Sequence, residues 1–533
     1  MSLDPTLRRV GAVAITALML GTAPAALLAE TPADTLVIAD AIDDIVSLDP
    51  HEAFEFSGTD VINNVYNGLI ELDPTKPGEL LPGLAESWSV ADDGVTYTFK
   101  MKSGITFASG NPVRAEDAAF SLRRIVKLNK NPAFIITQFG FTPENVDQMI
   151  KAEGDTLIVV TDKPYAPTFF YNCLTAQVGA IVDETTVMAN EVNGDMGNEW
   201  LKQNSAGTGP FILRSYKPNE SYVLDAREDY WGGAPALKRV FMRHIPEAAT
   251  QRLLLEKGDI DVAREMSTVD IEGIAGNADL KVEEDVGGQI YYISMNQKVA
   301  PLNNPKVLEA MRWAIDYQGM AGTFLKGQQR VHQAFLPSGY LGALDDTPYS
   351  LDIEKAKALL AESGVGPINV SMTVRNVQER MDIAQSIQNT FGQAGITLEL
   401  KVGDGKEVLQ DYRARNHQIT LQTWGPDYPD PQTNASTFAL NQDNSDEAKL
   451  TGSLAWRNAY DPGPLNAMVD AAVQERDSAK RAAMYEEMQR IHRDTSAFVL
   501  MFQQTYQTAM RANVMGFDTG GSTDSAAYWQ VTK

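Results

Sequence analysis

The sequence contains few of the residues on which thiol, imidazole or metal chemistry depends. Cysteine occurs once in 533 residues, so no disulfide can form within the chain. The five histidines form no H-E-x-x-H motif and no other pair at the spacing of metal ligands. A G-x-S-x-G nucleophile turn is absent, and no G-x-G-x-x-G loop follows a strand. We therefore expect no metal, no cofactor and no catalytic activity, with an unusual secreted hydrolase as the alternative.

Positive charge is also scarce. Lys and Arg number 45 against 70 Asp and Glu, which gives a formal net charge of -25. A chain this acidic cannot neutralise phosphates, so we expect no nucleic-acid partner, and anionic membrane surfaces are disfavoured. Hydrophobic residues make up 44% of the chain, and the length predicts two or three domains. Cys173 lies in the apolar stretch Phe169–Leu174 and is expected to be a buried core thiol.

Long apolar runs are missing after the N-terminus. No later segment has about 20 consecutive apolar residues, the length that a membrane-spanning helix needs. Residues 1–29 are typical of a secretory signal peptide, with two arginines, the apolar core Val10–Leu20 and a group of small residues. Cleavage is expected after Ala25 or after Ala29. An uncleaved membrane anchor is the alternative, which the short core and its interruption by glycine and proline disfavour.

Strand-like and helix-like segments alternate along the rest of the chain. Val95–Met101 and Asp155–Thr161 have the pattern of strands, and Ala115–Lys127 places apolar residues at helical spacing. Farther along, the strand pattern of Ile368–Val374 is followed by the helical pattern of Arg380–Ala394. This alternation predicts an α/β architecture.

One segment, Trp424–Pro431, contains three prolines and a glycine directly after the predicted strand Gln418–Thr423. This composition is incompatible with a helix interior or a central strand, so the segment is expected to be a stiff turn. Asp427, flanked by Trp424 and Tyr428, would then be held in one place, where it could capture a cationic and partly apolar group. The alternative is a turn cap, in which the carboxylate accepts hydrogen bonds from nearby backbone N–H groups.

Two other charged residues have competing interpretations. Asp430 lies between two prolines and is expected to be structural. Arg375 ends the predicted strand Ile368–Val374, and open α/β sheets form their clefts at the carboxyl ends of parallel strands. Its guanidinium could bind a carboxylate through two hydrogen bonds, whereas a surface salt bridge is the alternative.

Nine short motifs occur in order along the chain, and each alone is weak. They are Ser47–His51, Tyr66–Leu69, Leu81–Trp88, Thr96–Phe99, Gly104–Phe107, Gly110–Asp117, Gly207–Phe211, Tyr230-Trp231 and Gly258–Asp261. In this order they resemble the periplasmic solute-binding proteins of peptide ABC importers, extracytoplasmic family 5. The resemblance covers essentially the whole mature chain, and most of its motifs belong to the scaffold.

The resemblance implies an α/β fold of two lobes around a cleft, with an extra domain inserted into lobe I. The lobes of this family close over the ligand, which is a population shift driven by binding. The implied boundaries are a signal peptide at 1–29, lobe I at 30–69, 205–289 and 505–533, the inserted domain at 70–204, and lobe II at 290–504.

The same resemblance implies a function in transport. The chain is expected to be a periplasmic, monomeric component of an ABC importer that binds a short peptide and delivers it to a permease in the inner membrane. Members of this family also bind nickel chelates, haem, glutathione and oligosaccharides. A receptor of the same fold for a non-peptide solute, such as an oligosaccharide, an opine-like conjugate or a metal chelate, is therefore the alternative.

The resemblance also implies site residues. In oligopeptide receptors of this family, the aspartate of a W-x-x-D-Y motif holds the α-ammonium of the peptide; Trp424, Asp427 and Tyr428 match this motif. In dipeptide receptors, an arginine just after the strand that matches Ile368–Val374 binds the carboxylate of the ligand. Arg375 occupies that place.

Two phenylalanines match a further segment of the family, and one position differs from the family pattern. Phe54 and Phe56 match a segment near the ligand in lobe I, where they would line side-chain pockets or simply pack. Some tripeptide-type receptors carry an arginine three residues before the tryptophan, but this chain has Leu421 there, which weakens the tripeptide interpretation. Two further aromatic residues, Trp456 and Tyr460, could stack on a sugar, so a sugar receptor stays an alternative.

Overall fold

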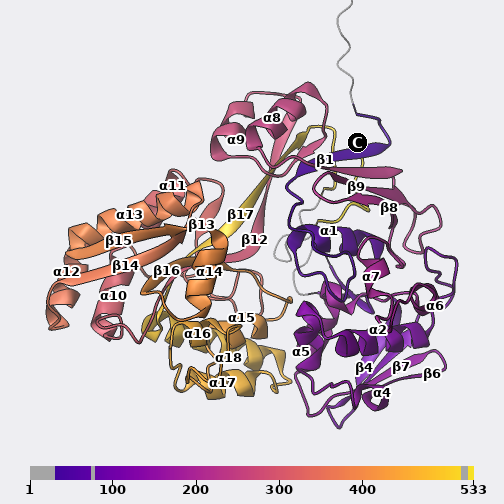
Figure 1. Ribbon diagram of the computed structural model, residues 1–533, viewed down its shortest axis with the longest axis horizontal. Helices are drawn as coiled ribbons and strands as arrows, with labels where there is room; N and C mark the ends of the chain where they lie inside the picture. Colours follow the sequence, from indigo (N-terminus) through magenta and orange to yellow (C-terminus); the bar gives the residue numbers. More distant parts are fainter. Residues whose placement is uncertain (1–30, 74–78, 518–525) are drawn as a thin grey trace, which may run out of the picture.

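An 11-stranded sheet runs through the molecule in the computed structural model, which describes residues 31–73, 79–517 and 526–533 (Figure 1). The predicted signal peptide, 1–29, and both candidate cleavage sites lie outside the described residues. The strand order is β15-β14-β16-β12-β17-β11-β1-β10-β9-β8, and β13 pairs with β17 beside this path. The strands are β1 (Thr35–Asp40), β8 (Phe211–Lys217), β9 (Ser221–Ala226), β10 (Arg239–His244), β11 (Val262–Ala263), β12 (Leu280–Met295), β13 (Gln329–Val331), β14 (Ile368–Arg375), β15 (Ile396–Gly403), β16 (Ile419–Trp424) and β17 (Phe498–Arg511).

The two longest strands, β12 and β17, connect the two groups of elements that Figure 1 shows on its left and right sides. They pair antiparallel, with a register shift between Val286 and Ile290. The C-terminal part of β12 also pairs with β16, and the C-terminal end of β17 pairs with β11. The crossings between lobes that we predicted near residues 290 and 505 would fall within this strand pair.

The sequence pattern predicts only the apolar parts of these two strands, Gln289–Met295 and Phe498–Phe502. The structure extends β12 back to Leu280 and β17 forward to Arg511. The middle of the pair carries mostly polar, partly exposed side chains, so it lacks the alternation that identifies a half-buried strand. The backbone pairing between β12 and β17 nevertheless continues through this polar middle part.

Strands β14, β15 and β16 form a parallel part of the sheet, and helices pack against it. Helix α13 (Gln378–Ala394) joins β14 to β15 and ends at Gly395, whose φ of 95° suits glycine. Helix α14 (Gly405–Arg413) begins at Asp404, which forms a capping box with Glu407. This helix leads into β16 and hence into the predicted turn. The order of strands and helices agrees with the predicted α/β class.

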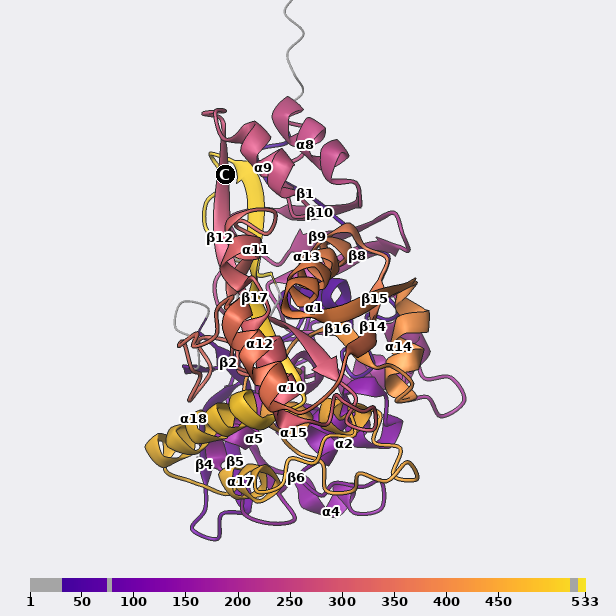
Figure 2. The same cartoon turned by 90° about the vertical axis from the view of Figure 1, so that its left-hand side faces the viewer.

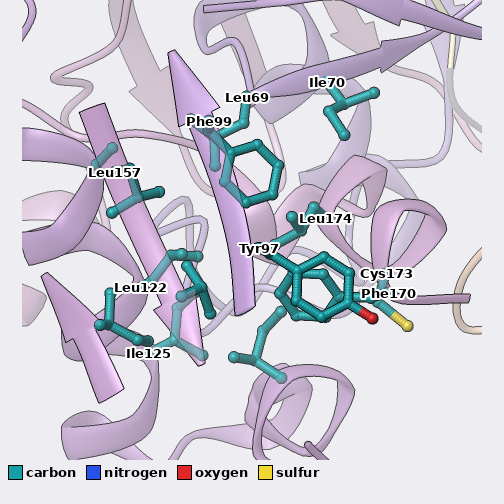
Figure 3. Close-up of a cluster of buried hydrophobic side chains, with 14 of the residues drawn as sticks. Leu69, Ile70, Tyr97, Phe99, Leu122, Ile125, Leu157, Phe170, Cys173 and Leu174 are labelled. Atoms are coloured by element: carbon teal, nitrogen blue, oxygen red, sulfur yellow. The ribbon is translucent and has the colours of Figure 1, made fainter. Parts of the chain in front are cut away.

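A separate four-stranded antiparallel sheet, in the order β4-β5-β7-β6, packs with α2 and α5 around its own core (Figure 3). Cys173 of α5 is fully buried there, which confirms the predicted core thiol. We propose that the inserted domain spans 70–204, as the sequence predicts. Its elements are β2 (Ile70–Leu72), β3 (Leu80–Pro82), β4 (Ala85–Val90), β5 (Thr96–Met101), α2 (Ala115–Leu128), α3 (Phe134–Thr137), α4 (Val146–Met149), β6 (Ile150–Glu153), β7 (Thr156–Val160), α5 (Pro167–Thr175), α6 (Glu184–Ala189) and α7 (Asn198–Leu201).

The remaining helices cover both groups of elements. Within the described ranges, no helix combines the length and the apolar character that crossing a membrane requires. These helices are α1 (Phe56–Val65), α8 (Ala248–Lys257), α9 (Thr268–Ile274), α10 (Pro305–Trp313), α11 (Tyr317–Gly322), α12 (Ile353–Glu362), α15 (Gln432–Phe438), α16 (Leu454–Arg457), α17 (Leu465–Ala472) and α18 (Ser478–Thr495).

Candidate ligand-binding site

A cavity of about 1570 Å³ lies between the two groups of elements. One wall includes Phe56, the first residue of α1, and Phe54, which lies two residues before it. The opposite wall includes Trp424, the last residue of β16, and Asp427 and Tyr428 from the turn after it. The volume exceeds the range of about 300–1,000 Å³ that is usual for small-molecule pockets, so a ligand of several residues would fit.

The turn after β16 holds Asp427 through the helix that follows it. The backbone N–H of Asp427 donates to Oγ1 of Thr433 at 3.0 Å, and the Thr433 hydroxyl donates back to Oδ2 of Asp427 at 3.5 Å. Thr433 is in the first turn of α15, so the helix fixes the position of the aspartate. Within the described part of the chain, the Asp427 carboxylate accepts no backbone N–H, and the structure therefore does not support the alternative of a turn cap.

The carboxylate of Asp427 lines the cavity without a compensating cation. No lysine, arginine or histidine among the described residues forms an ion pair with it. Burial raises the pKa of Asp427 to about 7, and the hydrogen bond from Thr433 offsets this only in part. A desolvated, unpaired carboxylate is unfavourable, and an incoming cation would relieve that cost. The cavity therefore favours a ligand with a positive group at this point.

Asp430, three residues farther along the turn, has the structural role that we expected. Its two oxygens accept hydrogen bonds from Arg481 at 2.6 and 2.7 Å, and neither side chain is more than 1% exposed. Its Oδ1 also accepts the backbone N–H of Gln432 at 2.9 Å, so Asp430 rather than Asp427 caps the turn. Asn172 of α5 donates to the same carboxylate at 3.3 Å. The ion pair thus stands where the two groups of elements meet.

Other contacts join the two groups at this place. Figure 2 shows α5 next to α17 and α18. Arg481 of α18 donates to Oγ1 of Thr168 at 3.3 Å, and the N–H of Ala166 donates to the carbonyl of Val473 at 2.6 Å. Tyr428, which is buried, packs its ring 6.0 Å from that of Phe169. One side of the cavity is therefore closed by direct contact between its two walls.

The predicted aromatic residues lie on both walls. Trp424 is partly buried, and its indole N–H has no hydrogen-bond partner among the described residues. Phe54 packs edge-on against Phe134, with ring centroids 6.0 Å apart, whereas Phe56 is 53% exposed. Together with Asp427 and Tyr428, five of the six residues that we predicted for the site lie on one cavity.

Arg375, the sixth, does not line this cavity, and its predicted placement in the cleft is corrected. It is exposed at the end of β14, and its guanidinium packs over Gly405 at the start of α14. The pairing of β14 with β16 ends at Thr373 and Thr420, so β16 continues beyond it and alone carries the turn to the cavity. Arg375 does lie at the carboxyl end of a parallel strand, as predicted, but its side chain packs against Gly405 and does not line the cavity.

Comparison with known proteins identifies the scaffold. The model of Bacterial extracellular solute-binding proteins, family 5 Middle, matches residues 79–446, more than half of the chain. The chain belongs to this family. It is 30% identical over 496 residues to the "Probable D,D-dipeptide-binding periplasmic protein DdpA" of Escherichia coli K12, covering 92% of each chain. It is 26% identical over 475 residues to the dipeptide-binding protein of the same organism, covering 85% of this chain and 86% of that one.

A solved structure supports the same conclusion about the fold. HbpA2 from Haemophilus parasuis is similar with a TM-score of 0.77 and 24% identity, covering 93% of this chain and 99% of the other. The family 5 protein therefore has the two-lobed α/β fold that the motifs imply, and the cavity lies between the lobes.

The family 5 protein does not use Trp456 and Tyr460 as an aromatic platform in the cavity. They are 4% and 7% exposed, and neither lines the cavity. The guanidinium of Arg415 covers the Trp456 ring at 4.4 Å, and the indole donates to the carbonyl of Ser445 at 2.8 Å. These two residues thus pack in the protein interior and give no support to a sugar site.

The cavity of this family 5 protein includes residues that the sequence did not single out as ligand contacts. Glu71 accepts a hydrogen bond from Asn67 at 3.2 Å, and burial raises its pKa to about 7. Trp231 belongs to one of the family motifs, so the sequence could have indicated it as a cavity residue. Nothing in the sequence indicates Arg413 and Arg457, because isolated arginines in helices are usually exposed surface residues. In the described ranges, no group of three or more His, Cys, Asp or Glu side chains could hold a metal ion.

Proposed function

We propose that this family 5 protein is the periplasmic solute-binding component of an ABC importer and captures a short peptide with a free N-terminus. The peptide would lie in the cavity between the lobes, and the closed complex would deliver it to a permease in the inner membrane. The protein would act as a monomer, without a cofactor and without changing the ligand chemically.

One observation carries this proposal: the carboxylate of Asp427 lies in the cavity wall, desolvated and without a cation. A peptide α-ammonium supplies the missing charge and up to three hydrogen-bond donors. An oligosaccharide offers no positive charge, and Trp456 and Tyr460 are not available to stack on one. The names of the two Escherichia coli relatives, which refer to dipeptides and D,D-dipeptides, favour the same class of ligand.

The proposal is tested by titration calorimetry with a library of di- and tripeptides that includes D,D-dipeptides. We expect at least one peptide to bind with one-to-one stoichiometry and to be recovered unchanged after incubation. Binding of an oligosaccharide or a metal chelate with no peptide binding would refute the peptide ligand. Hydrolysis of a bound peptide would show an enzyme instead.

The affinity for the peptide is expected to fall as the pH drops below about 7. Burial raises the pKa of Asp427 to about 7 in the unliganded protein, and only the ionised carboxylate attracts an ammonium group. Each pH unit below this pKa should weaken binding by roughly tenfold, because the fraction of ionised carboxylate falls tenfold. Calorimetry between about pH 5 and pH 8 measures the trend.

The variant Asp427→Asn is the control for this titration, since Glu71 has a similar pKa of about 7 and also lines the cavity. The variant should lose most of the dependence of affinity on pH. An unchanged dependence would assign it to Glu71.

The stability of the unliganded protein should follow the opposite trend: the raised pKa of Asp427 stabilises the fold at low pH, and this contribution is lost as the pH rises through about 7.

A further inference from the structure

Two arginines, Arg413 and Arg457, line the wall of the cavity that also carries Asp427. Arg457, at the end of α16, is 6% exposed. Its Nε donates to the carbonyl of Thr451 at 2.6 Å, and its guanidinium lies 5.0 Å from the ring centroid of Tyr412. These two contacts orient the side chain. Its terminal amino groups have no hydrogen-bond acceptor, and no carboxylate pairs with them, among the described residues.

Arg413 is the last residue of α14 and is exposed at the cavity. In the described part of the chain it forms neither a hydrogen bond nor an ion pair. Partial burial and the positive charge of Arg457 lower the pKa of Arg413. The two guanidinium groups therefore repel each other, and neither forms an ion pair with an acidic side chain among the described residues. An anion bound to both would relieve this repulsion.

The charges around the cavity indicate which anion fits. Among its described lining residues, Arg413 and Arg457 are the only basic ones, and the five acidic ones are Glu55, Glu71, Asp73, Asp285 and Asp427. These acids and the net charge of -25 oppose a polyanion such as phosphate. A single carboxylate carries one charge and has acceptor sites enough for two guanidinium groups, which donate in a fixed planar geometry.

We propose that Arg413 and Arg457 together bind the C-terminal carboxylate of the peptide whose ammonium Asp427 binds. The inference rests on the proposed function. All three residues belong to lobe II: Asp427 follows β16, and the arginines end α14 and α16. One lobe would thus hold both charged ends of the ligand, and closure of the other lobe would add contacts to its side chains. The protein would select zwitterionic peptides over peptide amides.

The test uses the tightest-binding peptide of the library in two forms, as the free acid and as its C-terminal amide. On the wild-type protein, calorimetry should show the amide binding about 10- to 100-fold more weakly, the range expected for losing hydrogen bonds to charged groups. The double variant Arg413→Met, Arg457→Met should bind the free acid with a similar loss and should no longer distinguish it from the amide.

The matched control is Arg375→Met, which removes the same charge outside the cavity and should leave the affinity for the free acid unchanged. Equal binding of acid and amide by the wild-type protein would overturn the inference and leave the peptide function intact. So would a loss caused by Arg375→Met but not by the double variant. The comparison on the wild-type protein needs no variant, so a folding defect cannot obscure it.

A third probe, N-acetylalanine, separates the two proposals, because it has a carboxylate but no ammonium. If no peptide binds, but N-acetylalanine binds and weakens in the double variant, the arginine site stands and the peptide function fails. If neither peptides nor N-acetylalanine binds the wild-type protein, both proposals are refuted.

Discussion

Replacing Asp427 by asparagine is expected to weaken peptide binding by at least about 2 kcal/mol, which is roughly 30-fold. The asparagine keeps the size of the side chain and can still accept a hydrogen bond from Thr433, but it offers no charge to an α-ammonium. The bound ammonium would then be desolvated without a counter-ion, and such truncations of a buried charge pair cost several kcal/mol. Calorimetry with the tightest-binding library peptide measures the change.

The matched control is Asp443→Asn, which removes one negative charge from an exposed residue outside the cavity. Its affinity for the same peptide should equal that of the wild-type protein, because salt screens an exposed charge that lies outside the cavity. Equal affinities of the Asp427→Asn variant and the wild-type protein would show that the ammonium is bound elsewhere.

Replacing Arg481 by methionine is expected to lower the free energy of unfolding by about 3–5 kcal/mol. The side chain of Asp430 is 0% exposed, and Arg481 supplies both of the hydrogen bonds that compensate its charge most directly. Without Arg481, a buried carboxylate would keep, among the described residues, only Asn172 and the N–H of Gln432 as donors. Urea unfolding of the unliganded protein, followed by circular dichroism, measures the loss.

A second arginine of α18 provides the control for this experiment. Arg490 is exposed and pairs with Glu486 at 3.0 Å, so Arg490→Met should change the free energy of unfolding by less than about 1 kcal/mol. Similar effects of the two variants would mean that the pair between Arg481 and Asp430 contributes no more than a surface salt bridge. The double variant Arg481→Met, Asp430→Asn should recover part of the stability, because the uncompensated charge is gone.

Local sequence patterns were sufficient for elements whose stability is local. The segments Ile368–Val374 and Arg380–Ala394 have clear strand and helix periods, and they correspond to β14 and α13. Tertiary contacts limit such predictions: the pattern predicts a helix over Ala467–Arg476, whereas α17 ends at Ala472. Directly after it, the carbonyl of Val473 accepts a hydrogen bond from the N–H of Ala166, the residue before α5, which is far away in the sequence.

The candidate site was predictable only where backbone chemistry constrains it. Three prolines and a glycine required a stiff turn, and this turn does present Asp427 to the cavity. The direction of the Arg375 side chain depends on packing against α14, which no local pattern encodes. Arg413 and Arg457 come from separate helices, and only the folded chain brings them to one wall.

Acetylating the N-terminus of a peptide removes the α-ammonium that we propose Asp427 to bind. The most direct test compares the tightest-binding library peptide with its N-acetylated form by calorimetry on the wild-type protein and on Asp427→Asn. We expect acetylation to weaken binding to the wild-type protein at least roughly 30-fold, the same loss as in the variant, and to have little further effect on the variant. Equal affinity of the wild-type protein for both peptides would show that Asp427 does not hold the ammonium.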